Sequence, residues 1–298
     1  MILTPGNHTF SADHLDLAYT VAGTGPALVV QPPGWGIGAG LYERSLQPLE
    51  RDFTVISLHP RGSGRSASPT DANDINVGRF VDDLEALRQH LQLGQMALFG
   101  HSHGGYIALN YALRYPQHLS HLVVVDAQLG VKEPGEDLQR TLPVLAQDPR
   151  RAEAVQAFSE PPNLKTDEDM SVFLARIAPL YFRDPQGEGV ALFRAFVRSN
   201  RVSLATDQAA GASDGRFLVR DRLKAITTPT LVLVGRHDFI CSPVQAEVIH
   251  HGIPGSQLAV FEDSGHLPWI DEPAACFVTM THFLKGSRPE RPAGPAGA

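Results

Sequence analysis

Short apolar runs separated by helical patterns constrain the fold of this chain more than any other feature. Five of the runs contain no charged residue, which is typical of strands buried on both faces of a parallel sheet: residues 27–30, 53–58, 96–99, 122–125 and 230–234. An alternating stretch at 15–21 predicts a strand nearer the sheet edge, and a further strand is expected at 257–261. A chain of 298 residues can bury a large core, so the pattern predicts an α/β fold.

Helical patterns lie between these runs. The clearest covers residues 77–91, where apolar residues recur at helical spacing and charged residues occupy the other side. A second helix is expected from Gly104 to just before Pro116, because helices usually end near a proline. Two more are predicted near 243–250 and 273–284.

The alternation of strands and helices stops after the run at 122–125. Residues 129 to about 220 contain helical pieces rich in charges and prolines, with no buried strand run. We therefore predict a sheet domain, formed by residues 1–128 and 221–285, that is interrupted by a helical insertion at 129–220. The last residues, 286–298, are rich in Pro, Ala and Gly and predict a disordered tail.

Composition excludes several classes of function. The formal charge of −7 offers no basic surface for nucleic acid or an anionic membrane. No apolar run reaches membrane-spanning length and the first residues show no signal-peptide pattern, so we expect a cytoplasmic protein. Two cysteines, Cys241 and Cys276, are too few for a disulfide framework or a zinc site of their own, and we expect reduced, buried thiols.

Residues 100–104 read Gly-His-Ser-His-Gly and stand between a predicted strand and a predicted helix. This is the context that the G-x-S-x-G motif requires. A turn this tight strains the serine backbone, needs small residues at 100 and 104, and directs the helix N-terminal amides towards the hydroxyl. The motif predicts Ser102 as a nucleophile; the alternative is a glycine-rich turn with a capping serine.

A nucleophilic serine needs a base within hydrogen-bond reach, and the base needs an orienting group. Asp238 follows the strand at 230–234, and His266 follows the strand at 257–261, so the order along the chain is serine, acid, histidine. Asp126 also ends a strand and is an alternative for the acid. Asp263, three residues before His266, fits a loop-capping role better.

These motifs resemble those of the α/β-hydrolase superfamily over most of residues 10–285: GHSHGG at 100–105, GRHD at 235–238 and SGHLPW at 264–269. The resemblance implies a mostly parallel eight-stranded sheet with a helical cap insertion. It also implies that Ser102 is the nucleophile, Asp238 the orienting acid and His266 the base. We expect no cofactor. Histidines adjoin these positions, but no H-E-x-x-H or carboxylate cluster accompanies them, so we expect no metal either.

The segment after the strand at 27–30 reads Gln-Pro-Pro-Gly-Trp-Gly. In the superfamily this position usually reads His-Gly followed by a variable residue, and here Pro33, Gly34 and Trp35 occupy those places. The resemblance implies that the backbone N–H groups of Trp35 and His103 form the oxyanion hole. The other interpretation is a Pro/Gly turn with a buried Trp35, and the two are compatible.

Further motifs resemble those of one branch of the superfamily. PRGSGRS at 60–66, the place of the insertion and GRHDFICSP at 235–243 resemble the proline-iminopeptidase-like branch. Typical members read His-Gly-Gly-Pro-Gly and Gly-Gly-Ser-Trp-Gly where this chain has QPPGWG and GHSHGG. Such peptidases bind a free amino terminus through cap carboxylates, for which this chain offers Glu160, Asp167, Glu168, Asp169, Asp184 and Glu188.

The predicted nucleophile is a serine and not an aspartate, which argues against epoxide and haloalkane hydrolysis. We predict a serine hydrolase that acts through an acyl-enzyme on a small or medium-sized ester, lactone or amide enclosed by the insertion. The alternatives are a proline-iminopeptidase-type aminopeptidase and a non-catalytic binder of a small ligand. We expect a small-molecule substrate and neither a nucleic-acid nor a membrane partner; homo-oligomerisation stays open.

The insertion contains apolar residues that either pack in its core or line the substrate pocket. Core packing is the commoner role for such residues. The sequence does not divide the set: Phe173, Leu174, Ile177, Leu180, Tyr181, Phe182, Phe193 and Phe196.

Overall fold

The computed structural model describes residues 3–130, 132–160 and 163–286, apart from the side chain of Asp214. Within these residues eight strands form one sheet in the order β1-β2-β4-β3-β5-β6-β7-β8. Only β2 runs antiparallel to its neighbours, so the sheet is mostly parallel, as predicted. The strands are β1 Gly6–Ala12, β2 Leu15–Gly23, β3 Ala27–Gln31, β4 Thr54–Leu58, β5 Met96–His101, β6 Leu119–Val125, β7 Thr230–Gly235 and β8 Gln257–Phe261.

All seven strands expected from sequence runs are present, and β1 is the one that the sequence runs did not indicate. It pairs antiparallel with β2 at the edge of the sheet, from Gly6 opposite Val21 to Ala12 opposite Leu15. Only Phe10 and Ala12 of this strand are buried. An edge strand with so little buried surface leaves a weak apolar pattern in the sequence.

The central strands bury both faces because successive side chains point to opposite sides. In β5, Leu98 belongs to the core cluster on one face and Phe99 to the cluster on the other. Helices α2 (Val77–His90), α3 (His103–Arg114) and α9 (Pro243–Gly252) pack on the Leu98 side. Helices α1 (Gly40–Ser45), α10 (Pro268–Asp271) and α11 (Pro273–Leu284) pack on the Phe99 side. The four helices predicted outside the insertion are therefore confirmed.

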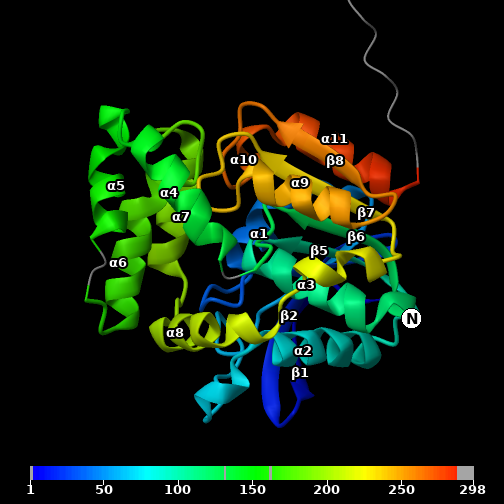
Figure 1. Cartoon of the computed structure of the whole chain (residues 1–298). Coiled ribbons are helices and arrows are strands. Elements are labelled where there is room, and N and C mark those ends of the chain that lie inside the picture. The colour runs from blue at the N-terminus through cyan, green and yellow to red at the C-terminus, as the bar shows by residue number, and fades with distance from the viewer. Residues whose placement is uncertain (1–2, 131, 161–162, 287–298) are drawn as a thin grey trace, which may run out of the picture.

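The segment between β6 and β7 is helical, and we call it the cap. In Figure 1 its helices α4 to α7 form a separate group beside the sheet, and α8 runs back towards α2. Its helices are α4 Glu133–Leu145, α5 Ala152–Ser159, α6 Asp167–Ile177, α7 Glu188–Ser199 and α8 Leu204–Ser213. Short 3-10 helices complete the described chain: η1 Gln47–Arg51, η2 Ala72–Asp74, η3 Pro116–His118, η4 Pro149–Arg151, η5 Ala178–Leu180, η6 Asp214–Arg216 and η7 Arg220–Ala225.

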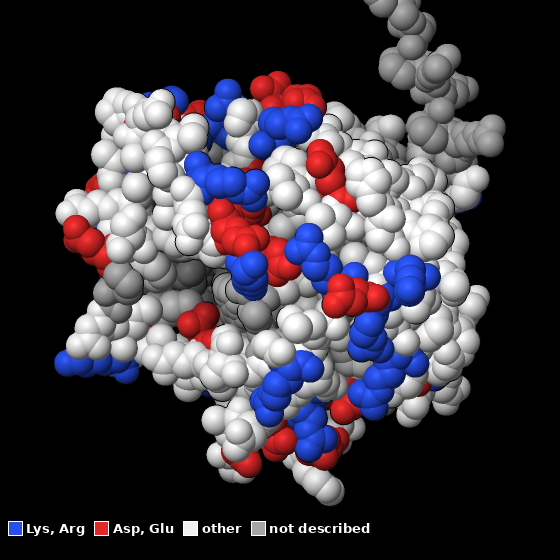
Figure 2. All heavy atoms as spheres, viewed as in Figure 1, with Lys and Arg blue, Asp and Glu red and all other residues white. Residues whose placement is uncertain are grey.

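Several whole-chain expectations can be compared with the structure. Within the described ranges, no helix has the length and apolar character needed to cross a membrane. Cys241 and Cys276 are both buried and form no disulfide. Basic and acidic side chains are interspersed on the face in Figure 2. The predicted tail lies outside the described residues beyond Gly286.

Candidate active site

Ser102 occupies the turn between β5 and α3. Its φ of 56° lies in the left-handed region, which is rare for a residue with a side chain and is often found at functional sites. The turn is fixed from both sides: Ser102 N–H donates to Val125 O over 3.0 Å, and Gly105 N–H donates to Ser102 O over 2.9 Å. The strained serine that the sequence predicts is therefore present.

The two glycines of the motif are required by close packing. A Cβ atom at Gly100 would lie 2.5 Å from Gly104 O and 2.7 Å from Ala108 Cβ. At Gly104 it would collide with the backbone of Gln31 and Pro32, in the segment that leads to Trp35. The nucleophile turn and the predicted oxyanion loop are thus in direct backbone contact.

Asp238 lies in the turn after β7 and is buried. Its Oδ2 accepts from His266 Nδ1 over 2.7 Å, and its Oδ1 accepts from the backbone N–H groups of Ile240 (3.0 Å) and Cys241 (3.1 Å). Burial by itself would raise the pKa of Asp238. The charge and hydrogen bond of His266, with the Ile240 N–H, instead hold the pKa below its usual value. Asp238 is therefore an ionised partner for the imidazole.

His266 follows β8 and shares a cavity wall with Ser102. Its backbone N–H donates to Tyr181 O over 2.7 Å, and its ring lies 5.5 Å from the Tyr181 ring, centroid to centroid. Because Nδ1–H donates to Asp238, Nε2 is the nitrogen left to accept a proton on the cavity side. The cap residue Tyr181 therefore holds this loop in place.

A second histidine supports the first. His101 is buried, and its Nε2 bonds to His266 O over 2.8 Å while its Nδ1 bonds to the Tyr42 hydroxyl over 2.7 Å. A carbonyl only accepts, so Nε2 carries the proton and Tyr42 donates to Nδ1. Burial, followed by the charge of His266, lowers the pKa of His101 well below its usual value. His101 is thus a neutral side chain that connects Tyr42 to the His266 loop through two hydrogen bonds.

Asp126, the alternative acid, ends β6 and is wholly buried with a φ of 44°. Its Oδ1 accepts from Gly235 N–H over 2.9 Å, while its buried Oδ2 has no hydrogen-bond partner among the described residues. Burial and the charge of Asp238 raise the pKa of Asp126 well above its usual value, which favours the protonated carboxyl. His266 bonds to Asp238, the acid that the sequence favours.

The predicted oxyanion loop is tied to the nucleophile turn. Gly34 N–H donates to His103 Nδ1 over 3.0 Å, and the Trp35 ring lies 5.4 Å from the His103 ring. Trp35 also lines the cavity that contains Ser102. On the cap side, Ser203 N–H donates to Gly36 O over 3.0 Å. The structure therefore places Trp35 and His103 beside Ser102.

The cavity beside Ser102 is small, about 60 Å³, and mostly apolar. Larger hollows, such as one of about 550 Å³ between η1 and α11, contain none of the predicted site residues. Among the residues that the structure describes, no carboxylate belongs to the lining of the small cavity. Its walls are formed by Pro33, Trp35, Ile37, Leu41, Tyr42, His101, Ser102, Tyr181, Phe193, Ile240, His266 and Leu267.

The structure divides the apolar cap residues that the sequence could not. Tyr181 and Phe193 line the cavity, and the other six of that set belong to the apolar cluster that the cap shares with one face of the sheet. The six carboxylates considered for amine recognition are all exposed: Glu160, Asp167, Glu168, Asp169, Asp184 and Glu188. Some of them cap helices, as Asp169 does at the start of α6. None of them lines the cavity.

One acidic cap residue near the site was missed by sequence reasoning. Asp207 lies on α8, and burial raises its pKa to about 6. The nearby His103 acts in the other direction and lowers this pKa. Its charge also acts on Tyr181, which lines the cavity. No motif surrounds Asp207, and only the fold of the cap brings it near His103.

Cys241 was likewise not assigned to the site. One potential ligand atom each from Asp238, Cys241 and His266 lie within 4.8 Å of one another, and all three residues are buried. Asp238 and His266 already bond to each other, so we interpret them as an acid–base pair and not as part of a metal site. Burial raises the pKa of Cys241 well above its usual value, so the thiol is neutral.

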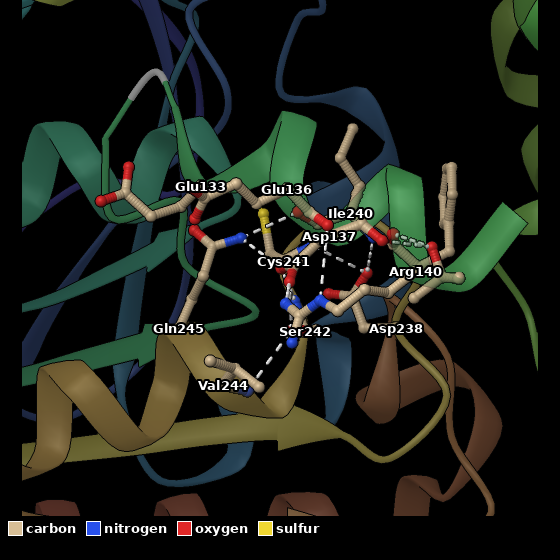
Figure 3. A network of polar contacts seen from close by, with 12 residues as sticks. Glu133, Glu136, Asp137, Arg140, Asp238, Ile240, Cys241, Ser242, Val244 and Gln245 are labelled. Carbon is tan, nitrogen blue, oxygen red and sulfur yellow. Dashed lines mark hydrogen bonds and ion pairs between the residues drawn. The ribbon is translucent and has the colours of Figure 1, made fainter.

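The loop that carries Asp238 is bound to the cap by a polar network (Figure 3). Its centre is Asp137 of α4, a buried carboxylate that accepts from Ser242 and Gln245. Thr141, one turn further along α4, donates to Phe239 O over 2.7 Å. Neither Asp137 nor Thr141 stands in a recognisable motif.

Comparisons with known proteins agree with the fold. The sequence model of the family described as "alpha/beta hydrolase fold" matches residues 27–273. A proline iminopeptidase of Saccharolobus solfataricus is 28% identical over 275 residues, covering 89% of this chain and 87% of that protein. A thermophilic esterase from Thermogutta terrifontis superposes with a TM-score of 0.71 at 26% identity, covering 93% of this chain and 96% of that one. The enol-lactonase from Burkholderia xenovorans LB400 superposes with a TM-score of 0.74 at 20% identity, covering 93% and 100%.

Proposed function

This chain belongs to the alpha/beta hydrolase fold family, and from that premise we propose that it is a serine hydrolase that cleaves small esters or lactones through an acyl-enzyme. The observation that carries the proposal is the placement of Ser102 and His266 in one cavity wall, with Asp238 behind the imidazole. The partner that this site binds is a small molecule.

In the proposed mechanism, Ser102 Oγ attacks the substrate carbonyl carbon while His266 Nε2 takes the hydroxyl proton. Asp238 keeps the other ring nitrogen protonated and stabilises the imidazolium. The backbone N–H groups of Trp35 and His103 stabilise the oxyanion of the tetrahedral intermediate. The imidazolium then protonates the leaving alkoxide, and a water activated by His266 hydrolyses the acyl-enzyme.

The size and lining of the cavity favour a short, uncharged acyl group. Its volume is about 60 Å³ and its walls are mostly apolar, which suits a short acyl chain better than a long one. A substrate ammonium in this apolar cavity would lack a carboxylate among the lining residues. Burying an unpaired charge is costly, which disfavours a free-amine substrate. The similarity to the Thermogutta terrifontis esterase also supports an ester.

The second candidate is an aminopeptidase of the proline-iminopeptidase type. It is supported by the 28% identity to the Saccharolobus solfataricus enzyme and by Asp207. This carboxylate is half-buried, and its charge acts on the cavity residue Tyr181. If the substrate carried an ammonium group, Asp207 would be the group that pairs with it.

Two substrate series distinguish these functions: p-nitrophenyl esters of increasing acyl length, and proline and alanine p-nitroanilides with free or blocked amines. We expect kcat/KM to be highest for the acetyl or propionyl ester and to fall with longer chains, with little anilide turnover. Asp207→Asn should then change ester hydrolysis only slightly. Turnover of free-amine prolyl anilide that is lost on blocking the amine, and in Asp207→Asn, would establish the aminopeptidase instead. Binding of small ligands without turnover in either series would favour the non-catalytic binder.

A further inference from the structure

Asp137 is a buried carboxylate that the proposed reaction does not use. It lies in α4 of the cap, yet its side chain is only 1% exposed and points into the sheet domain. Its partners Ser242 and Gln245 are 105 and 108 residues away in sequence. Figure 3 shows the side chain between α4 and the loop after β7. A buried carboxylate in this position needs several donors to be tolerated.

The hydrogen-bonding capacity of the Asp137 carboxylate is filled. Oδ2 accepts from Ser242 N–H over 2.8 Å and from Gln245 Nε2 over 2.6 Å. Oδ1 accepts from Ser242 Oγ over 2.7 Å and from the guanidinium of Arg140. Hydrogen bonds to an ionised acceptor are stronger than neutral ones. Three of the four donors come from the segment just after Asp238, so Asp137 holds that segment firmly.

The same segment sets the position of Asp238. The N–H groups of Ile240 and Cys241 donate to Asp238 Oδ1, and Gln245 Nε2 donates to Ile240 O over 2.9 Å as well as to Asp137. Gln245 therefore connects the Asp137 carboxylate to the residue that orients Asp238. These hydrogen bonds connect α4 of the cap to Asp238 Oδ1. The other carboxylate oxygen, Asp238 Oδ2, bonds to His266.

We propose that Asp137 is a positioning residue for Asp238: the cap fixes the acid loop as well as covering the substrate. The inference rests on the proposed function. Its structural content, that Asp137 maintains the Asp238–His266 bond, holds whatever the substrate. If the hydrogen bonds of Asp137 are weakened, the loop after β7 relaxes and the Asp238 carboxylate no longer points at the imidazole. Small misplacements of catalytic groups cost about 100-fold in rate. The loss should appear in kcat, because Asp137 does not line the cavity.

The test compares Asp137→Asn with the matched control Asp169→Asn. Asp169 is also a cap carboxylate, but it bonds only to the backbone at the start of α6. The amide of Asp137→Asn has the same shape and turns one acceptor into a donor that faces other donors. With p-nitrophenyl acetate, and with active sites counted by a phosphonate probe, we expect kcat to fall about 100-fold. We expect KM to change less than about 3-fold, and Asp169→Asn to match the wild type.

A second readout does not depend on turnover. A buried imidazole N–H donated to a carboxylate gives a far-downfield proton NMR signal, and His266 Nδ1–H should give one in the wild type and in Asp169→Asn. We expect Asp137→Asn to shift or lose it. If the wild type hydrolyses no ester, this signal still tests the positioning role, so failure of the proposed function and failure of this inference remain distinguishable.

The outcomes separate positioning from mere packing. A folded Asp137→Asn with a lower melting temperature, normal kcat and an unchanged downfield signal would overturn the inference. If Asp137→Asn does not fold, Ser242→Ala removes the Oγ donor to Asp137 and the cap that Oγ gives Val244 N–H at the start of α9, and it leaves the Ser242 N–H bond to Asp137. It should then give a smaller fall in kcat and a smaller shift of the signal, and unchanged values of both would overturn the inference as well.

Discussion

His266 Nδ1 donates to Asp238 Oδ2 over 2.7 Å, and both side chains are almost completely shielded from solvent. In a buried site this bond fixes the tautomer and orientation of the imidazole. It joins the loop after β8 to the loop after β7, and each loop is also held by the cap. The predictions below follow from this bond and its surroundings.

Asp238→Asn should abolish most activity while the protein stays folded. The amide no longer holds the required imidazole tautomer, and in a comparable triad this change lowers kcat by about four orders of magnitude. Steady-state kinetics with p-nitrophenyl acetate give the measurement, and circular dichroism checks the fold.

Asp126→Asn is the matched control for that variant. An Asn at 126 keeps the shape of the carboxyl group, and its amide oxygen still accepts from Gly235 N–H. We expect kcat within about 10-fold of the wild type, because no partner of Asp238 is lost. If Asp126→Asn were inactive and Asp238→Asn active, the orienting acid would be Asp126.

Asp126 also predicts how stability changes with pH. Burial and the charges of Asp238 and Asp271 raise the pKa of Asp126, and the hydrogen bond from Gly235 N–H partly opposes this rise. Above about pH 3.9 the carboxyl is ionised in the unfolded chain, so folding then takes up a proton. Its stabilising contribution is therefore complete below that pH and is lost as pH rises towards the folded pKa. Relative to Asp126→Asn, the wild type should lose up to about 1.4 kcal/mol per pH unit in that range. Urea unfolding of both proteins between pH 5 and pH 8 measures this difference; parallel curves would contradict it.

Replacing glycine by alanine should have opposite effects on the free energy of unfolding at Gly104 and at Gly211. Gly104→Ala places a Cβ against the Gln31 and Pro32 backbone and should cost about 1–3 kcal/mol of unfolding free energy, with loss of activity. Gly211→Ala, in α8, meets nothing within 4 Å and should stabilise by about 0.5–1 kcal/mol. Thermal or urea unfolding compares them, and equal stability of the two variants would mean that the contact between turn and oxyanion loop is not tight.

Much of the fold could be predicted because its signals are local. Each central strand is an uninterrupted apolar run, and the turn at Ser102 needs glycines at fixed positions. The acid and the histidine could be proposed because the carboxyl ends of neighbouring parallel strands meet at one edge of the sheet. Strand β1 escaped prediction from its own residues, since an edge strand buries too little to show a pattern.

The contacts that support the candidate site could not be predicted. Tyr42 and His101 are 59 residues apart, and Asp137 and Ser242 are 105 apart. No spacing rule relates such pairs, because tertiary packing alone brings them together. The raised pKa of Asp126 depends on the same packing, since burial and the neighbouring Asp238 cause it.

The central claim is that Ser102 forms a covalent acyl-enzyme, and mass spectrometry after reaction with a fluorophosphonate tests it most directly. The reagent labels a serine only when a neighbouring base activates it. We predict one adduct per chain in the wild type, located by peptide mapping at Ser102, and no adduct and no ester turnover in Ser102→Ala. Labelling at another residue, or near-normal turnover by Ser102→Ala, would contradict the account.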